Sequence, residues 1–121
     1  MKYSDFQRLE KILILLNKLL NYIRTNMINR EDIILSETVQ WTITTPLYNI
    51  GEHAYMLSKP FKEKYDHIPW SKISGLRHRL VHDYEDTNWE IICDVIYDVL
   101  PKFEIETKAL LDKIRKEESN I

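Results

Sequence analysis

Apolar side chains recur along residues 6–23 at alternating spacings of three and four residues. This spacing follows the 3.6-residue repeat of an α-helix, so the segment predicts one long amphipathic helix. Ser4 is its expected N-cap, because a serine hydroxyl can accept a hydrogen bond from the first turn. The stripe is broad enough to indicate contact with more than one neighbouring helix, or with a second subunit. Its members are Phe6, Leu9, Ile12, Leu13, Leu15, Leu16, Leu19, Leu20 and Ile23.

A second helix is expected from about residue 37 to 57, with Ser36 as its cap. Pro46 lies inside this segment and should kink the helix or break it, because proline cannot donate the helical hydrogen bond. Three aromatic residues spaced seven apart form a separate stripe on the same helix. Such a ladder is more often core or subunit interface than a base-stacking surface. The three are Trp41, Tyr48 and Tyr55.

Two more helices are expected in the second half of the chain. One should start near Pro69 and end within "HDYEDTN", with its apolar residues facing inward. The other should follow a cap at Asp86 or Thr87 and bend at Pro101. The segment between residues 26 and 37 is expected to be a connection with about one helical turn.

Length and composition agree with this pattern. The chain has 121 residues, 44% of them apolar, and only two glycines and four prolines. These values predict a single all-α domain over residues 1–121, with 116–121 as a frayed polar tail. The expected architecture is an antiparallel up-and-down bundle of four main helices plus short helices.

Cys93 is the only cysteine, which precludes an internal disulfide, and its apolar neighbours predict a small buried side chain. The longest apolar run, "ILILL", is far too short to span a bilayer. No signal peptide is recognised at the start. We therefore expect a cytoplasmic protein without a membrane segment.

Charge is distributed unevenly along the chain. The formal net charge is −2, but residues 59–84 hold six basic and three acidic side chains, a balance of +3. Residues 85–121 hold five basic and ten acidic side chains, a balance of −5. The basic block could attract a partner that carries phosphate groups. An ordinary solvated helix face would produce the same pattern.

The basic block ends in "LRHRLVHDYED", residues 76–86, where titratable side chains are concentrated. At ~100° per residue, His78 and His82 lie next to each other on one side of a helix. Arg77 lies ~140° away from His82 by the same arithmetic. Arg77 and His82 could therefore meet only if the helix ends or distorts between them, or if two subunits each contribute one.

Several functions are compatible with this cluster. His78 and His82 are spaced as two metal ligands on one helix face, with Asp83, Glu85 or His53 as possible further ligands. Alternatively, a histidine could move a proton at neutral pH while an arginine binds a phosphodiester, which needs no metal. The same residues could bind an acidic partner passively. Finally, basic residues commonly decorate a helix C-terminus without any function.

Three landmarks, "NIGE" at 49–52, "IPW" at 68–70 and "GLRHRLVHDY" at 75–84, resemble a known family. They are similar to the HepT-like (DUF86) ribonuclease toxins of the HEPN superfamily. The resemblance covers about residues 37–115, and residues 1–36 match only as a leading helix.

The resemblance implies a function and a mechanism. The family pattern is an arginine, four to six residues, a histidine, and a tyrosine two residues later, which Arg77, His82 and Tyr84 match. Arg77 and His82 would be the catalytic pair of a metal-independent endoribonuclease that needs no cofactor and leaves 2′,3′-cyclic phosphate ends. The family acts as homodimers, which would bring two motifs into one cleft. A minimal nucleotidyltransferase antitoxin would inactivate the toxin by transferring AMP from ATP to Tyr84.

The resemblance also indicates supporting residues and one departure. Glu52 could orient Arg77 across the bundle, or form a structural ion pair only. His78, Arg79 and Lys72 are candidates for RNA binding or support. His78 stands where the family commonly has asparagine, which makes a non-catalytic, nucleotidyltransferase-associated binding module the alternative to an enzyme.

Overall fold

The computed structural model describes residues 3–81 and 86–119, and every regular element in these ranges is helical. The prediction of an all-α fold is therefore confirmed. The elements in chain order are α1 (Asp5–Thr25), α2 (Arg30–Leu35), α3 (Glu37–Met56), α4 (Lys59–Lys64), α5 (Trp70–Val81), α6 (Trp89–Asp94), a π-helical turn η2 (Val95–Val99) and α7 (Leu100–Ser119).

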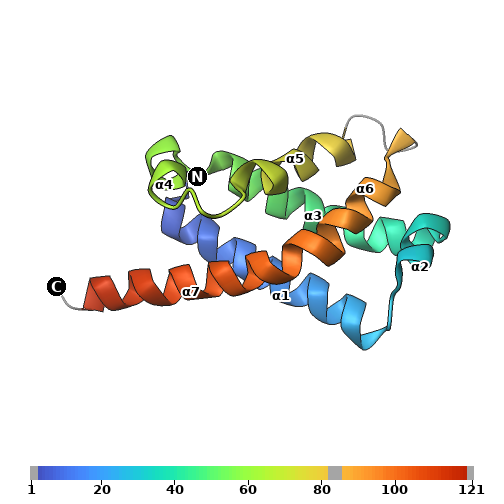
Figure 1. The fold of residues 1–121 in the computed structure, drawn as a ribbon, viewed down its shortest axis with the longest axis horizontal. Coiled ribbons are helices and arrows are strands. Elements are labelled where there is room, and N and C mark those ends of the chain that lie inside the picture. Colours follow the sequence, from blue (N-terminus) through green and yellow to red (C-terminus); the bar gives the residue numbers. More distant parts are fainter. Residues whose placement is uncertain (1–2, 82–85, 120–121) are drawn as a thin grey trace.

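The longer helices run in alternating directions (Figure 1). The chain passes to the right in α1, returns in α3, runs right again in α5 and returns through α6 and α7. α3 packs against both α1 and α5, and α1 also packs against α7. The broad apolar face of α1 is thus explained within one chain, by its two helical neighbours.

The N-termini of α1 and α3 begin as their sequences predict. The Ser4 hydroxyl accepts a hydrogen bond from the backbone N–H of Gln7, whose side chain completes a capping box. The Ser36 hydroxyl accepts from the backbone N–H of Val39. α3 then continues through Pro46 without a break, so the expectation of a break there was wrong. Packing of α3 on both α1 and α5 holds it helical despite the missing donor.

The second half of the chain corrects two boundaries. The cap of α6 is Asn88, whose side-chain oxygen accepts from the backbone N–H of Ile91, rather than Asp86 or Thr87. α7 continues to Ser119, so residues 116–119 are helical rather than frayed. No glycine or proline interrupts this end of α7, and its lysines and glutamates favour helix.

The irregularity expected at Pro101 takes the form of the π-helical turn η2. The N–H of Leu100 donates to the carbonyl of Val95, five residues earlier, just before the proline that cannot donate at all. Wider turns of this kind are where a helix accommodates an interruption of its regular bonding.

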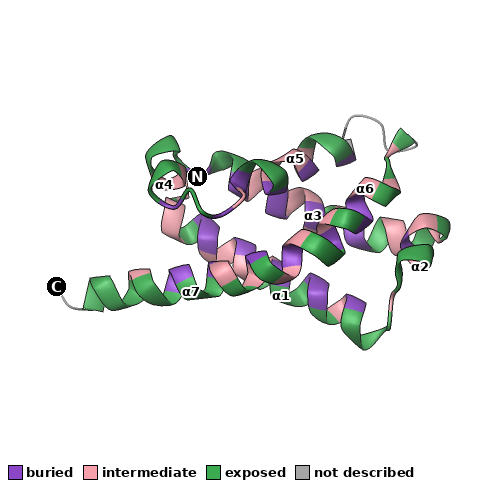
Figure 2. Ribbon diagram, in the orientation of Figure 1, coloured by how far each residue is buried: buried purple, intermediate pink, exposed green. Residues whose placement is uncertain are grey.

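The buried residues lie where the helices face one another (Figure 2). The inward stripe predicted for α5 is fully buried, and the Trp70 indole N–H donates to the carbonyl of Tyr65 at 3.0 Å. Cys93 is buried as predicted. In the described part of the chain, no helix combines the length and apolarity needed to cross a membrane. The α5 stripe consists of Trp70, Ile73, Leu76 and Leu80.

The aromatic ladder on α3 does not belong to the core at its two ends. Trp41 is 58% exposed and Tyr55 is 50% exposed, whereas Tyr48 is partly buried against the core. Trp41 and Tyr55 are therefore not core residues, and the alternative of a subunit interface stays a prediction.

Candidate active site

α3 and α5 approach each other most closely where Gly51 meets Arg77. A β-carbon built on Gly51 would lie 2.7 Å from the backbone nitrogen of Arg77 and 3.1 Å from the carbonyl oxygen of Ile73. Real side chains do not tolerate such a distance, so only glycine permits this crossing. The close approach places the start of the Arg77 side chain directly beside the residues that follow Gly51 on α3.

Arg77 is held by two residues of α3. Its Nε lies 2.6 Å from Oε2 of Glu52, and both side chains are about one-third exposed, at 36% and 34%. The Arg77 guanidinium carbon also lies 4.1 Å from the centre of the Tyr55 ring. The carboxylate thus contacts one edge of the guanidinium and the aromatic ring covers one of its faces. Among the described residues, no hydrogen bond or ion pair joins the two terminal nitrogens of Arg77.

The Glu52–Arg77 contact is electrostatic rather than a well-aligned hydrogen bond. Oε2 of Glu52 is a buried oxygen without a hydrogen-bond donor in good geometry, although the positive charge of Arg77 lies beside it. A buried carboxylate oxygen without a donor is unfavourable unless a nearby charge compensates it. The structure thus places Glu52 in contact with Arg77 across the bundle, while the orienting role of Glu52 stays a prediction.

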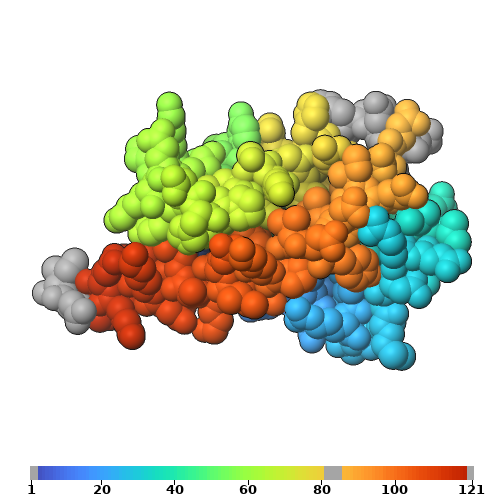
Figure 3. Space-filling view, viewed as in Figure 1, coloured from blue at the N-terminus to red at the C-terminus, as the bar shows by residue number. Residues whose placement is uncertain are grey.

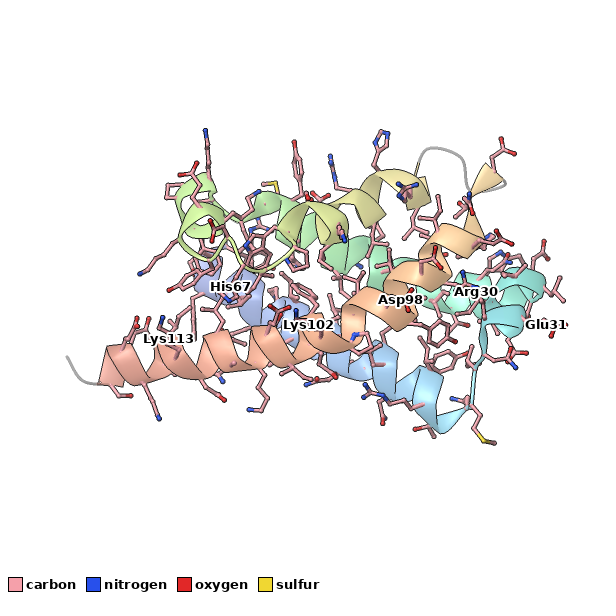
Figure 4. The ribbon with its side chains drawn as sticks, viewed as in Figure 1. Arg30, Glu31, His67, Asp98, Lys102 and Lys113 are labelled. Carbon is pink, nitrogen blue, oxygen red and sulfur yellow. The ribbon has the colours of Figure 1, made fainter. Side chains whose placement is uncertain are left out.

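The other candidate residues of α5 divide between two faces. His78 and Arg79 are exposed. Lys72 is exposed too, but it lines a hollow between α5 and α7 rather than the α3 side where Arg77 lies. Figure 4 shows three other residues of that hollow beside α7: His67, Asp98 and Lys102. The structure does not bring Lys72 to Arg77, because five residues turn a helix by ~140°.

His82 and Tyr84 lie outside the described residues, as do Asp83 and Glu85. Their predicted roles therefore stay predictions. Within residues 3–81 and 86–119, no three histidine, cysteine or acidic side chains are grouped so that they could hold a metal ion.

His53, named above as a possible metal ligand, has a different environment. Its Nδ1 lies 3.2 Å from Nη1 of Arg8, which is only 9% exposed. Burial is the main factor that lowers the pKa of His53, and the positive charges of Arg8 and Lys11 lower it further. An arginine side chain has only hydrogen-bond donors, so Arg8 Nη1 donates and His53 Nδ1 accepts. A neutral ring fits this position.

Sequence reasoning did not identify Gly51 and Tyr55 as parts of this site. A lone glycine within a helical pattern does signal a close packing contact, and Gly51 stood in the landmark "NIGE". Tyr55 was noted only as one member of the aromatic ladder. Its contact with Arg77 depends on how α3 and α5 cross, which periodicity within one helix cannot provide.

The fold and this site define an all-helical protein whose candidate active site is an arginine-centred cluster on the crossing of two helices. The family model for "Ribonuclease HepT-like" proteins matches residues 7–110. This chain belongs to that HepT-like family. No solved structure matches it significantly.

Named relatives agree with this assignment. "Putative RNase TTE0752" of Caldanaerobacter subterraneus subsp. tengcongensis is 33% identical over 90 residues, covering 74% of this chain and 80% of the relative. "Putative RNase MJ0127" of Methanocaldococcus jannaschii is 29% identical over 96 residues, covering 79% of each chain. "Probable ribonuclease HepT" of Thermococcus cleftensis is 25% identical over 86 residues, covering 71% of this chain and 74% of the relative.

Proposed function

We propose that this protein is a metal-independent endoribonuclease and the toxin of a type VII-like pair with a minimal nucleotidyltransferase antitoxin. The observation that supports it most directly is the placement of Arg77. Glu52 contacts its Nε and the Tyr55 ring covers one face of the guanidinium, so two contacts from α3 limit the orientations that this side chain can take. A guanidinium that is oriented before the substrate arrives can stabilise charge on a phosphate without reorganising.

The proposed reaction is attack by the ribose 2′-oxygen on the adjacent phosphorus. The bond from phosphorus to the 5′-oxygen breaks, which leaves a 2′,3′-cyclic phosphate and a 5′-hydroxyl. His82 serves as the base that takes the proton from the 2′-hydroxyl, or as the acid that gives a proton to the leaving 5′-oxygen. Arg77 binds the phosphate and stabilises its developing negative charge. RNA supplies its own nucleophile, so the chemistry requires no metal ion.

The proposal includes a homodimer. On one straight helix Arg77 and His82 would lie ~140° apart, so a second copy would bring another motif to the same cleft. The exposed Trp41 on α3 is available to such an interface. Its place of action is proposed to be the cytoplasm.

The off-switch in this proposal is Tyr84. Transfer of AMP from ATP to its hydroxyl would add a bulky anion beside Arg77, which would fill the RNA site and repel the substrate. The intact mass of the protein co-expressed with its neighbouring nucleotidyltransferase tests this step. An unmodified mass, or an adduct that persists in Tyr84→Phe, would remove Tyr84 from the proposal.

Ribonuclease activity is tested by incubating the purified protein with RNA in EDTA. We expect cleavage to cyclic-phosphate ends, lost in Arg77→Ala and in His82→Ala while both variants keep the helical content of the wild type. Absence of cleavage by the folded wild type would refute the enzyme. Cleavage that persists fully in His82→Ala would refute only the catalytic assignment.

The alternative is a non-catalytic module that docks a nucleotidyltransferase, and the His78 departure from the family pattern is what favours it. Expression in a bacterial host separates the two functions. Toxicity that disappears with Arg77→Ala supports the ribonuclease, whereas harmless expression of the wild type supports the module.

A further inference from the structure

Tyr55 is an exposed aromatic ring surrounded by positive charge from two other helices. Arg77 of α5 lies over the ring at 4.1 Å, and Nζ of Lys62 on α4 lies 6.0 Å from the ring centre. Lys62 is fixed there by donating to the backbone carbonyl of Tyr55 at 3.2 Å. Three successive helices, α3, α4 and α5, thus meet at one side chain. In Figure 3 the C-terminal half of α3 emerges between α4 and α5 along one edge of the molecule.

The ring contributes little to the core. Tyr55 is 50% exposed, and its neighbour Met56 is 47% exposed. An aromatic side chain in a domain of this size is usually buried, because burial of its large apolar surface stabilises the fold. An exposed ring that carries cations fits instead a surface that binds flat, electron-rich groups joined to phosphates.

We propose that Tyr55 is a stacking subsite for an unpaired nucleobase of the RNA substrate. The base lies against the exposed part of the ring, its phosphate is bound by Arg77, and Lys62 attracts the next phosphate along the strand. The inference rests on the proposed ribonuclease function and adds the class of substrate to it. A phosphate and the base of the same nucleotide are separated by one ribose, which suits an arginine and a tyrosine in direct contact.

Two properties of the substrate follow. The base must be unpaired, because a base within a duplex already stacks on its neighbours and its face is unavailable. The subsite should tolerate all four bases, because every base has an aromatic face and Tyr55 adds few base-specific donors. The substrate class is therefore single-stranded RNA, bound with little dependence on sequence at this position.

A different role for Tyr55 would be to support the Arg77 guanidinium without touching RNA. The two roles differ in what they require of the substrate. A support for Arg77 acts through the phosphate and would be indifferent to the base beside it. A stacking subsite loses its contribution when that base is absent.

The test measures binding of a single-stranded oligonucleotide with 2′-O-methyl riboses, which cannot be cleaved, and the strand is kept too short to bind in a second register. One abasic residue is moved along the strand, and the dissociation constant is measured at fixed salt for each position. For the wild type we expect one position at which the abasic residue weakens binding by about 5- to 100-fold. Tyr55→Ala should weaken binding of the intact strand by a similar factor, and the abasic residue should then have no further effect. Tyr55→Trp should restore the dependence on that base.

Ile105→Ala is the control, because Ile105 is a 70% exposed apolar residue on α7, a helix that carries none of Tyr55, Arg77 and Lys62. It should leave the positional dependence unchanged. The inference is overturned if no abasic position matters, if the protein does not bind the strand, or if Tyr55→Ala weakens intact and abasic strands equally. Because the assay requires no cleavage, these failures differ from the failure of RNA cleavage in EDTA, which would refute the ribonuclease itself.

Discussion

Gly51 and Arg77 meet backbone to backbone, with only 2.7 Å between the Arg77 nitrogen and the place where a β-carbon of Gly51 would stand. The next residue on α3 is Glu52, whose carboxylate contacts the Arg77 side chain. The landmark "NIGE" therefore combines two physical roles in adjacent positions. Gly51 allows α5 to come close to α3, and Glu52 contacts the arginine that this close approach brings to it.

Gly51→Ala should disrupt this crossing. The added methyl group would meet backbone atoms, which cannot rotate away, so α3 and α5 must separate. Overpacking of this kind costs about 1–3 kcal/mol of stability, against the helix propensity that alanine gains over glycine. We expect a lower urea midpoint with an unchanged slope, and a loss of RNA cleavage because Arg77 moves relative to Glu52.

Gly75→Ala is the matched control within α5. A β-carbon there meets nothing within 4 Å, so the substitution adds helix propensity without a clash. It should stabilise the protein by roughly 0.5–1 kcal/mol and leave cleavage intact. Equal effects of the two substitutions would contradict the close approach of α3 and α5 as the reason for Gly51.

Glu52→Gln should show whether Glu52 orients Arg77 for catalysis or only stabilises the fold. The variant keeps the size of the side chain but removes the charge beside Arg77 Nε, which frees the guanidinium to leave the Tyr55 ring. Partly exposed ion pairs contribute little to stability, so the melting temperature should change by only a few degrees. Misplacing a positioned group costs far more in catalysis, and we expect cleavage to fall by about 10- to 100-fold.

Glu10→Gln provides the comparison for Glu52→Gln. Glu10 forms an ion pair with Arg115 at 3.2 Å on a different part of the surface. This variant should have the same small effect on stability and none on cleavage. If Glu52→Gln leaves cleavage unchanged, the Glu52–Arg77 pair is structural only.

The helices were predictable because their signals are local. The stripe on α1 and the serine caps of α1 and α3 depend on residues within one or two turns, and the structure confirms them. The path of the chain through η2 depends on packing between distant segments. For that reason periodicity did not predict the π-helical turn before Pro101.

The sequence identified residues of the candidate site but not how they are arranged in space. The family pattern singled out Arg77 and Glu52 from their order in the chain, and their contact is present. The role of Tyr55 and the distance of Lys72 from Arg77 arise from how α5 is rotated against α3 and α7. Rotation of one helix against another is a tertiary property, so residue spacing within a helix does not determine it.

Asn88→Ala should reveal the true start of α6. The Asn88 side chain accepts the backbone N–H of Ile91, and loss of such a cap costs about 1 kcal/mol. Asp86→Ala, which alters an exposed residue that sequence alone favoured as the cap, should change stability by less than about 0.5 kcal/mol. Chemical denaturation of both variants checks this, and the opposite ranking would contradict the observed cap.

Stability should depend on pH through His53. Burial first, then the positive charges of Arg8 and Lys11, lower the pKa of this histidine below its ordinary value of about 6.5, while the charge of Glu52 has a smaller, opposite effect. Between the lowered pKa and about 6.5, the unfolded chain binds more protons than the folded protein does. Stability therefore rises with pH through this window, is fully present above about 6.5, and is lost as the pH falls.

Denaturant midpoints measured from pH 5 to pH 8 test this dependence. His53→Gln should reduce the loss of stability below about pH 6.5, because glutamine cannot take up the proton. Arg8→Met should reduce this loss of stability only in part, because burial is the larger cause of the lowered pKa of His53 and remains in the variant. If the wild type and His53→Gln lose stability in parallel as the pH drops, another group titrates in this range and His53 is not responsible.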